Sequence, residues 1–84
     1  MKNVDVFFYT RPNCHLCEEA KWVMKLVQEE IAMTLQERNI DESDEWTEKY
    51  GLMIPVVEYG GELVQYGQID YVTVLEKLKQ KVNK

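Results

Sequence analysis

Both cysteines of the chain lie at one junction between two predicted elements. Residues 3–9 are rich in β-branched and aromatic side chains, which predicts a strand. After a break over residues 10–13, apolar residues recur at three- and four-residue steps, which predicts a helix that begins at about His15. Cys14 and Cys17 therefore stand at the amino end of a helix. There, unpaired backbone N–H groups and the helix dipole favour a thiolate over a thiol.

The spacing Cys14-His15-Leu16-Cys17 puts the second sulfur about one helical turn beyond the first, close enough for a disulfide. This pattern predicts thiol–disulfide exchange, with Cys14 as the nucleophile and Cys17 as the thiol that resolves a mixed disulfide. Three alternatives stay open. The pair could be inert and buried, or the chain could be a non-catalytic binding module. Alternatively, a cysteine-bridged dimer could hold a metal ion or iron–sulfur cluster, because one chain offers too few ligands for a closed zinc site even if His15 takes part.

Length and composition predict a single globular domain over residues 1–84. A chain with 45% hydrophobic and 30% charged residues is not typical of disorder, and the net charge of −5 argues against nucleic-acid binding. No apolar run approaches the roughly 20 residues that span a bilayer, and residues 1–5 lack a secretory signal. We therefore expect a cytoplasmic protein, a monomer without a membrane partner. In that reducing compartment a lone cysteine pair favours redox or metal chemistry over a structural disulfide.

The hydrophobic pattern predicts seven elements in the order β-α-β-α-β-β-α. Their expected bounds are strand 3–9, helix 15–30, strand 32–39, a short helix that ends at about residue 50, strand 56–59, strand 62–66 and helix 69–82. Residues 41–45 are expected to supply the capping and first-turn acidic side chains of the short helix. The first β-α-β unit is expected to be a right-handed parallel crossover, and Gly60-Gly61 predicts the turn of an antiparallel hairpin. The result is a mixed four-stranded sheet with helices packed on its faces.

Two helices carry apolar stripes that predict their buried faces. On the helix 15–30 the stripe comprises Leu16, Ala20, Val23, Met24, Val27 and Ile31; on the last helix it comprises Ile69, Val72, Leu75, Leu78 and Val82. Aromatic residues, Trp22 and Trp46 among them, are expected in the core or at its rim. Near the carboxyl end of the last helix, a cluster of lysines is expected to complement the helix dipole: Lys77, Lys79, Lys81 and Lys84.

Three segments of the chain together resemble the glutaredoxins. Residues 8–17 are similar to the opening of that family, in which a strand ends in Tyr-Ser/Thr, a basic residue follows and the Cys-x-x-Cys comes three residues later. Residues 53–57 resemble the family's Val-Pro strand entry, and residues 39–41 fall where glutaredoxins carry an Asn/Val-Asp after the second strand. The resemblance covers nearly the whole chain in element order. It implies a thioredoxin fold and is closest to a group of small glutaredoxin-like proteins with the same compact layout.

The resemblance also implies a substrate site around the cysteines. Proline 55 would be preceded by a cis bond and face the cysteines, so that the amide and carbonyl of Ile54 could pair with an extended substrate. On the residues alone, Pro55 would be an ordinary trans proline at the start of a strand. Arg11 would attract the thiolate or a substrate carboxylate, unless it is a solvated loop residue. Tyr66 and Gly67 would line the substrate groove.

The chain departs from the glutaredoxin pattern at two places. His15 and Leu16 replace the usual Pro-Tyr, and Gly67 alone remains of the Gly-Gly that shapes the glutathione groove. We therefore expect no bound cofactor, with glutathione a candidate reductant and a protein disulfide or small thiol as the substrate. Protonated His15 would stabilise a thiolate and neutral His15 could relay a proton, unless it is simply solvated. Glu18 and Glu19 oppose negative charge on the sulfur.

Overall fold

A computed structural model describes residues 4–82 of the chain, so the expected strand start at Asn3 and the expected cation Lys84 lie outside the described residues. The helices and strands are β1 (Val4–Thr10), α1 (His15–Glu30), β2 (Met33–Asn39), η1 (Ile40–Glu42), α2 (Asp44–Tyr50), β3 (Val56–Tyr59), β4 (Glu62–Tyr66) and α3 (Tyr71–Val82). They form one mixed sheet in the order β2-β1-β3-β4. β1 and β2 are parallel, whereas β1/β3 and β3/β4 are antiparallel, as the sequence predicts.

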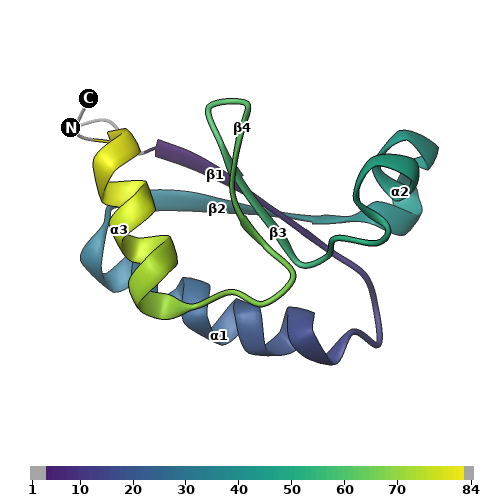
Figure 1. Cartoon of the computed structure of the whole chain (residues 1–84), viewed down its shortest axis with the longest axis horizontal. Coiled ribbons are helices and arrows are strands. Elements are labelled where there is room, and N and C mark those ends of the chain that lie inside the picture. Colours follow the sequence, from purple (N-terminus) through teal and green to yellow (C-terminus); the bar gives the residue numbers. More distant parts are fainter. Residues whose placement is uncertain (1–3, 83–84) are drawn as a thin grey trace.

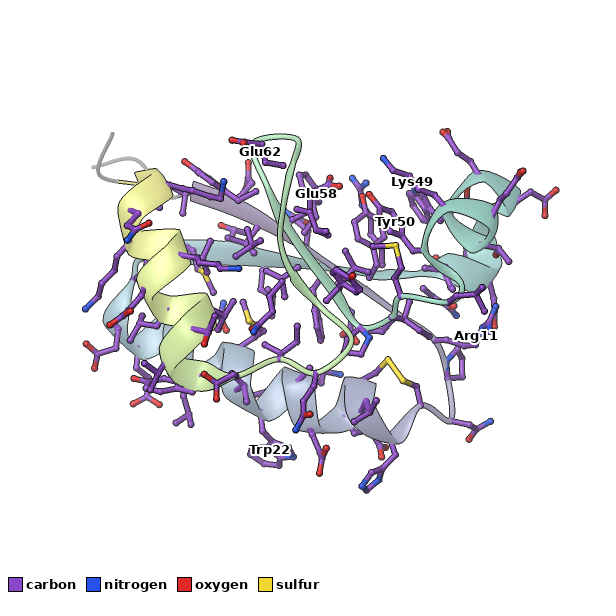
Figure 2. The ribbon with its side chains drawn as sticks, in the orientation of Figure 1. Arg11, Trp22, Lys49, Tyr50, Glu58 and Glu62 are labelled. Carbon is purple, nitrogen blue, oxygen red and sulfur yellow. A yellow bond between two sulfur atoms is a disulfide. The ribbon has the colours of Figure 1, made fainter. Side chains whose placement is uncertain are left out.

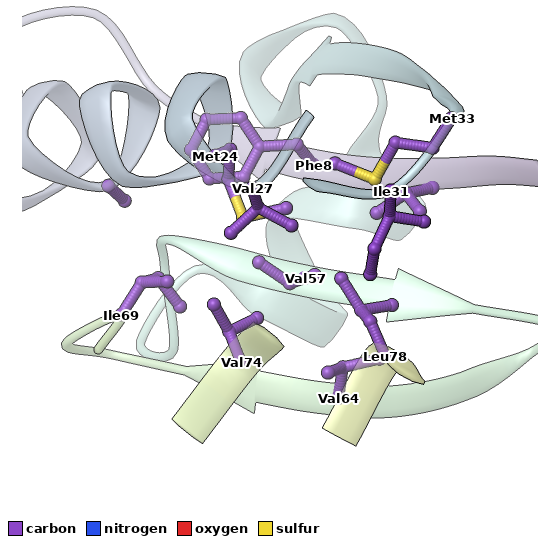
Figure 3. Packing of buried hydrophobic residues seen from close by; sticks show 12 residues of the cluster. Phe8, Met24, Val27, Ile31, Met33, Val57, Val64, Ile69, Val74 and Leu78 are labelled. Atoms are coloured by element: carbon purple, nitrogen blue, oxygen red, sulfur yellow. The ribbon is translucent and has the colours of Figure 1, made fainter. Parts of the chain in front are cut away.

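The two faces of the sheet have separate cores. Helices α1 and α3 cover one face of the sheet, and Val6 and Phe8 of β1 point to that face. Figure 3 shows the core between these helices and the sheet. Because side chains alternate along a strand, Phe7 and Tyr9 point to the opposite face. Helix α2 packs on that face at the carboxyl end of β1, at the far end of the molecule from α3 in Figure 1.

Aromatic rings and one arginine hold α2 against the sheet. Tyr9 of β1 stacks on Tyr50 with ring centroids 4.4 Å apart, and the edge of Trp46 meets Tyr9 at 5.6 Å. The Arg38 guanidinium lies 4.2 Å from the centroid of the Phe7 ring and donates to the Tyr9 hydroxyl at 3.1 Å. These contacts fix the ends of β1 and β2 relative to α2, and the segment that joins β1 to α1 starts at this place.

The short helix predicted to end at about Tyr50 is confirmed as α2, but the segment before it forms a helical element of its own. The structure has the short 3-10 helix η1, a break at Ser43 and then α2. Two side chains cause the break, because each caps a separate helix start. The Asn39 side chain accepts from the Asp41 N–H at 2.9 Å, and the Ser43 hydroxyl accepts from the Trp46 N–H at 3.2 Å.

The predicted buried faces need two corrections. Leu16 is exposed, because the buried stripe of α1 begins at Cys17. On α3, Val72 is exposed and Val74 is buried instead. The helix starts at Tyr71, two residues later than predicted. At about 100° per residue, Val72 lies more than about 100° around the axis from the centre of the face that Val74 and Leu78 bury, which leaves it exposed. Trp22 stands on the outer face of α1, 69% exposed, rather than in the core or at its rim as expected.

The hairpin is formed as predicted. Gly60 and Gly61 connect β3 to β4 with φ of 61° and 79°. Two successive residues other than glycine rarely adopt such positive φ values. Across residues 4–82, none of the helices combines the length and the apolar character that crossing a bilayer requires.

Candidate functional site

Cys14 occupies the N-cap of α1. Its backbone is extended (φ −107°, ψ 107°), and its Sγ accepts a hydrogen bond from the Cys17 N–H at 3.1 Å. The two cysteines are joined by a disulfide, with their Cα atoms 5.1 Å apart (Figure 2). When the disulfide is reduced, the N–H and the helix dipole at this position stabilise negative charge on the Cys14 sulfur.

The two sulfurs differ in exposure in the order that the sequence predicts. Cys14 is half-buried, whereas Cys17 is only 4% exposed and lies within α1. Both line a groove of about 460 Å³ at the amino end of α1. A molecule that enters this groove therefore reaches Cys14 more easily than Cys17.

A hydrogen bond at Thr10 and the backbone conformation of Asn13 position the segment between β1 and α1. Thr10, the last residue of β1, is buried, and its hydroxyl donates to the Glu37 carboxylate of β2 at 3.4 Å. Asn13 adopts a positive φ of 60°, which turns the chain into the helix immediately before Cys14. The carboxyl ends of the parallel strands β1 and β2 thus place the start of α1.

Arg11 lies beside the cysteines, as the resemblance implies, but its charge is already engaged. Its Nε donates to the Asp41 carboxylate of η1 at 2.9 Å, and both side chains are partly exposed. Figure 2 shows Arg11 on the segment that leads to the disulfide. The ion pair connects this segment to η1. Asp41 belongs to the motif of residues 39–41, but its contact with Arg11 could not be predicted because the two residues are 30 positions apart.

His15 is directed toward solvent. Its ring is 84% exposed, and its Nε2 lies 3.6 Å from the Glu19 carboxylate one helical turn further along α1. It does not line the groove that holds the cysteines. The structure is therefore closest to the solvated alternative for His15, and a role in tuning Cys14 stays a prediction.

The Ile54–Pro55 peptide is cis, as the resemblance implies. The Gly67 N–H donates to the carbonyls of both Met53 and Pro55 at 2.9 Å, so Gly67 holds this segment against the end of β4. Pro55 itself is fully buried. The expectation that the Ile54 amide faces a substrate is wrong. This N–H donates to the Tyr50 carbonyl at 3.1 Å, which leaves the Ile54 carbonyl for such a pairing.

The predicted substrate residues fall on two sides of the cysteines. Ile54, Pro55, Tyr66 and Gly67 belong to the β3–β4 side of β1, and the exposed Tyr66 pairs with Val56 in the sheet. The groove of the cysteines lies on the β2 side. The sequence did not predict that this groove is also lined by Lys21, Glu37, Asn39 and Glu42. The parallel pairing of β1 and β2 is the signal that could have found Glu37 and Asn39, since it sets Phe8 beside Glu37 and Thr10 beside Asn39.

The geometry offers little to a metal ion. Within residues 4–82 no three or more His, Cys, Asp and Glu side chains converge in an arrangement that could hold one. Cys14 and Cys17 supply two sulfurs, and the exposed His15 ring lies next to Glu19. A zinc site made by one chain would need four convergent ligands.

Sequence and structure comparisons agree with this geometry. Residues 5–83 match the glutaredoxin-like domain (DUF836). The chain belongs to this family. Two similar solved structures, each 24% identical, are target protein XcR50 from X. campestris and protein Ne2328 from Nitrosomonas europaea. Their TM-scores are 0.78 and 0.75; XcR50 aligns over 89% of this chain and 96% of its own, and Ne2328 over 88% and 89%.

A thioredoxin superposes on this glutaredoxin-like chain as well. Thioredoxin 1 from Thermosipho africanus is 8% identical, with a TM-score of 0.69 over 94% of each chain. The predicted thioredoxin fold is therefore confirmed. Together, the fold and a cysteine pair within disulfide distance support a redox function in general terms.

Proposed function

We propose that this glutaredoxin-like protein is a thiol–disulfide oxidoreductase that exchanges electrons with protein disulfides or mixed disulfides of glutathione. The observation that carries the proposal is the position of Cys14. Its sulfur caps α1, accepts the Cys17 N–H at 3.1 Å and opens onto a groove, while Cys17 is buried behind it. This arrangement supports a stabilised, reachable thiolate with a second thiol in reach. We further propose that the protein acts as a monomer in the cytoplasm.

The proposed reaction has two exchange steps. The Cys14 thiolate attacks one sulfur of a substrate disulfide, an S–S bond forms between them and the other substrate sulfur leaves as a thiolate. The Cys17 thiolate then attacks Cys14 Sγ, which releases the second substrate thiolate and forms the Cys14–Cys17 disulfide. Two electrons pass from the protein to the substrate. A thiol reductant, with glutathione as one candidate, regenerates the dithiol, so the reaction needs no resident cofactor.

Two serine substitutions test the proposal. With 2-hydroxyethyl disulfide as substrate and dithiothreitol as reductant, Cys14→Ser should abolish catalysed turnover, because the attacking sulfur is gone. Pre-reduced Cys17→Ser, freed of dithiothreitol and then mixed with the same disulfide, should complete only the first step and accumulate a mixed disulfide at Cys14, which mass spectrometry of the intact protein detects. The variants serve as matched controls, since each removes the same disulfide. Undiminished turnover by Cys14→Ser would refute the proposal.

A further inference from the structure

The groove beside Cys14 contains two cations, and both are engaged. Arg11 pairs with Asp41 at 2.9 Å, and Lys21 of α1 pairs with the Glu37 carboxylate of β2 at 3.2 Å. Each of these carboxylates offsets the charge of its cation, so an anionic group that entered the groove would meet a cation that is already paired. The groove therefore offers no unpaired cation to a substrate carboxylate.

Two carboxylates in the same groove are not engaged in this way. Glu18 follows Cys17 in the first turn of α1, and Glu42 ends η1; both are exposed and line the groove. Among residues 4–82, neither carboxylate forms an ion pair. The two negative charges thus border the same groove that Cys14 lines.

This inference rests on the proposed function. We propose that Glu18 and Glu42 determine which class of disulfide the protein reduces. The groove selects disulfides that carry a positive charge near the sulfur, such as a cystine flanked by lysine or arginine in a protein. An ammonium or guanidinium group would pair with the two carboxylates while the sulfur meets Cys14. Glutathione disulfide, whose net charge is negative, is disfavoured by the same carboxylates.

Three small disulfides with equal spacers test this selection. Cystamine ends in ammonium groups, 2-hydroxyethyl disulfide in neutral hydroxyls and 3,3′-dithiodipropionate in carboxylates. The pre-reduced protein is mixed with each one, and the first-turnover rate is divided by the rate of the same disulfide with dithiothreitol, which corrects for intrinsic reactivity. In each turnover the protein loses two electrons, its disulfide forms and two small thiols are released.

We expect the corrected rate for cystamine to exceed that for dithiodipropionate by about tenfold at low ionic strength, and the ratio to shrink as salt screens the charges. The double variant Glu18→Gln/Glu42→Gln should bring the ratio close to one. A matched control, Glu29→Gln/Glu76→Gln, removes the same net charge from exposed positions outside the groove and should keep the wild-type ratio.

The outcomes separate the two proposals. If the reduced protein fails to react with neutral 2-hydroxyethyl disulfide, the proposed function itself fails. If it reacts with that disulfide but shows a ratio near one for the charged pair, the oxidoreductase stands and the selection by charge is overturned. An equal loss of the ratio in both double variants also overturns it, because overall charge and not the groove would then be responsible.

Discussion

Tyr50 is the residue whose titration the structure perturbs most clearly. Burial raises the pKa of its phenol well above the usual range, and the hydrogen bond to the Glu58 carboxylate and the charge of that group raise it further. The folded state therefore keeps this proton, whereas the unfolded chain releases it above a pH of about 10. The stabilisation is fully present below that pH and is lost as the pH rises further.

We expect Tyr50→Phe to lower the free energy of unfolding by about 1 kcal/mol at neutral pH, because the Glu58 carboxylate loses its donor. Between a pH of about 10 and 11, the stability of the variant should fall less steeply than that of the wild-type protein. Urea denaturation across this range measures both effects. Equal alkaline slopes for the two proteins would contradict the assignment to Tyr50.

At the residue scale, the sequence predicted those parts of the site that depend on residues close to one another in the chain. Cys14 and Cys17 could be placed at a helix start from their spacing, and the cis bond before Pro55 from the family motif. The Arg11–Asp41 and Lys21–Glu37 pairs could not be predicted, because each joins two elements whose register only the folded sheet fixes. The charge of the groove therefore becomes visible only in three dimensions.

At the scale of elements, the start of α3 depends on one side chain. The Asp70 carboxylate accepts from the Thr73 N–H at 2.9 Å, and this backbone hydrogen bond lowers the pKa of Asp70. Because the folded-state value is the lower one, the stabilisation is present above the unfolded pKa of about 3.9 and is lost as the pH falls below it.

Asp70→Ala should therefore unfold at lower urea concentration than the wild-type protein at pH 7. Asp70→Asn keeps an accepting side-chain oxygen, so it should stay closer to wild type. Toward a pH of about 3, the stability of the wild-type protein to urea should move closer to that of both variants, since the Asp70 carboxylate becomes protonated. A difference in stability that stays constant over this range would show that the Asp70 charge contributes nothing to the cap.

The elements themselves were largely predictable, and the errors have identifiable causes. Hydrophobic period and turn residues located all four strands and both long helices. The 3-10 helix η1 was not predicted, because the acidic run over residues 41–45 is also compatible with the cap and first turn of a single helix. Val72 is predicted on the buried face because it lies three residues before Leu75, whereas the buried face centres on Val74 and Leu78 and leaves Val72 outside it.

For the molecule as a whole, the topology places the chemistry. The parallel pair β1/β2 brings its carboxyl ends together, with α1 starting next to one and η1 next to the other. The order of the elements therefore places the candidate site at this end of the sheet. Element order was also what the sequence predicted most completely, because the first β-α-β unit and the hairpin each follow from short-range signals.

The central claim is that Cys14 and Cys17 form an exchanging dithiol–disulfide pair. Its most direct test is to equilibrate the protein with mixtures of reduced and oxidised dithiothreitol, starting once from the oxidised and once from the reduced protein. Free thiols are then alkylated and counted by mass. We expect one two-electron transition, identical from both directions, in which both cysteines change together. A pair that keeps its starting state in every mixture, or different end points from the two directions, would contradict the claim.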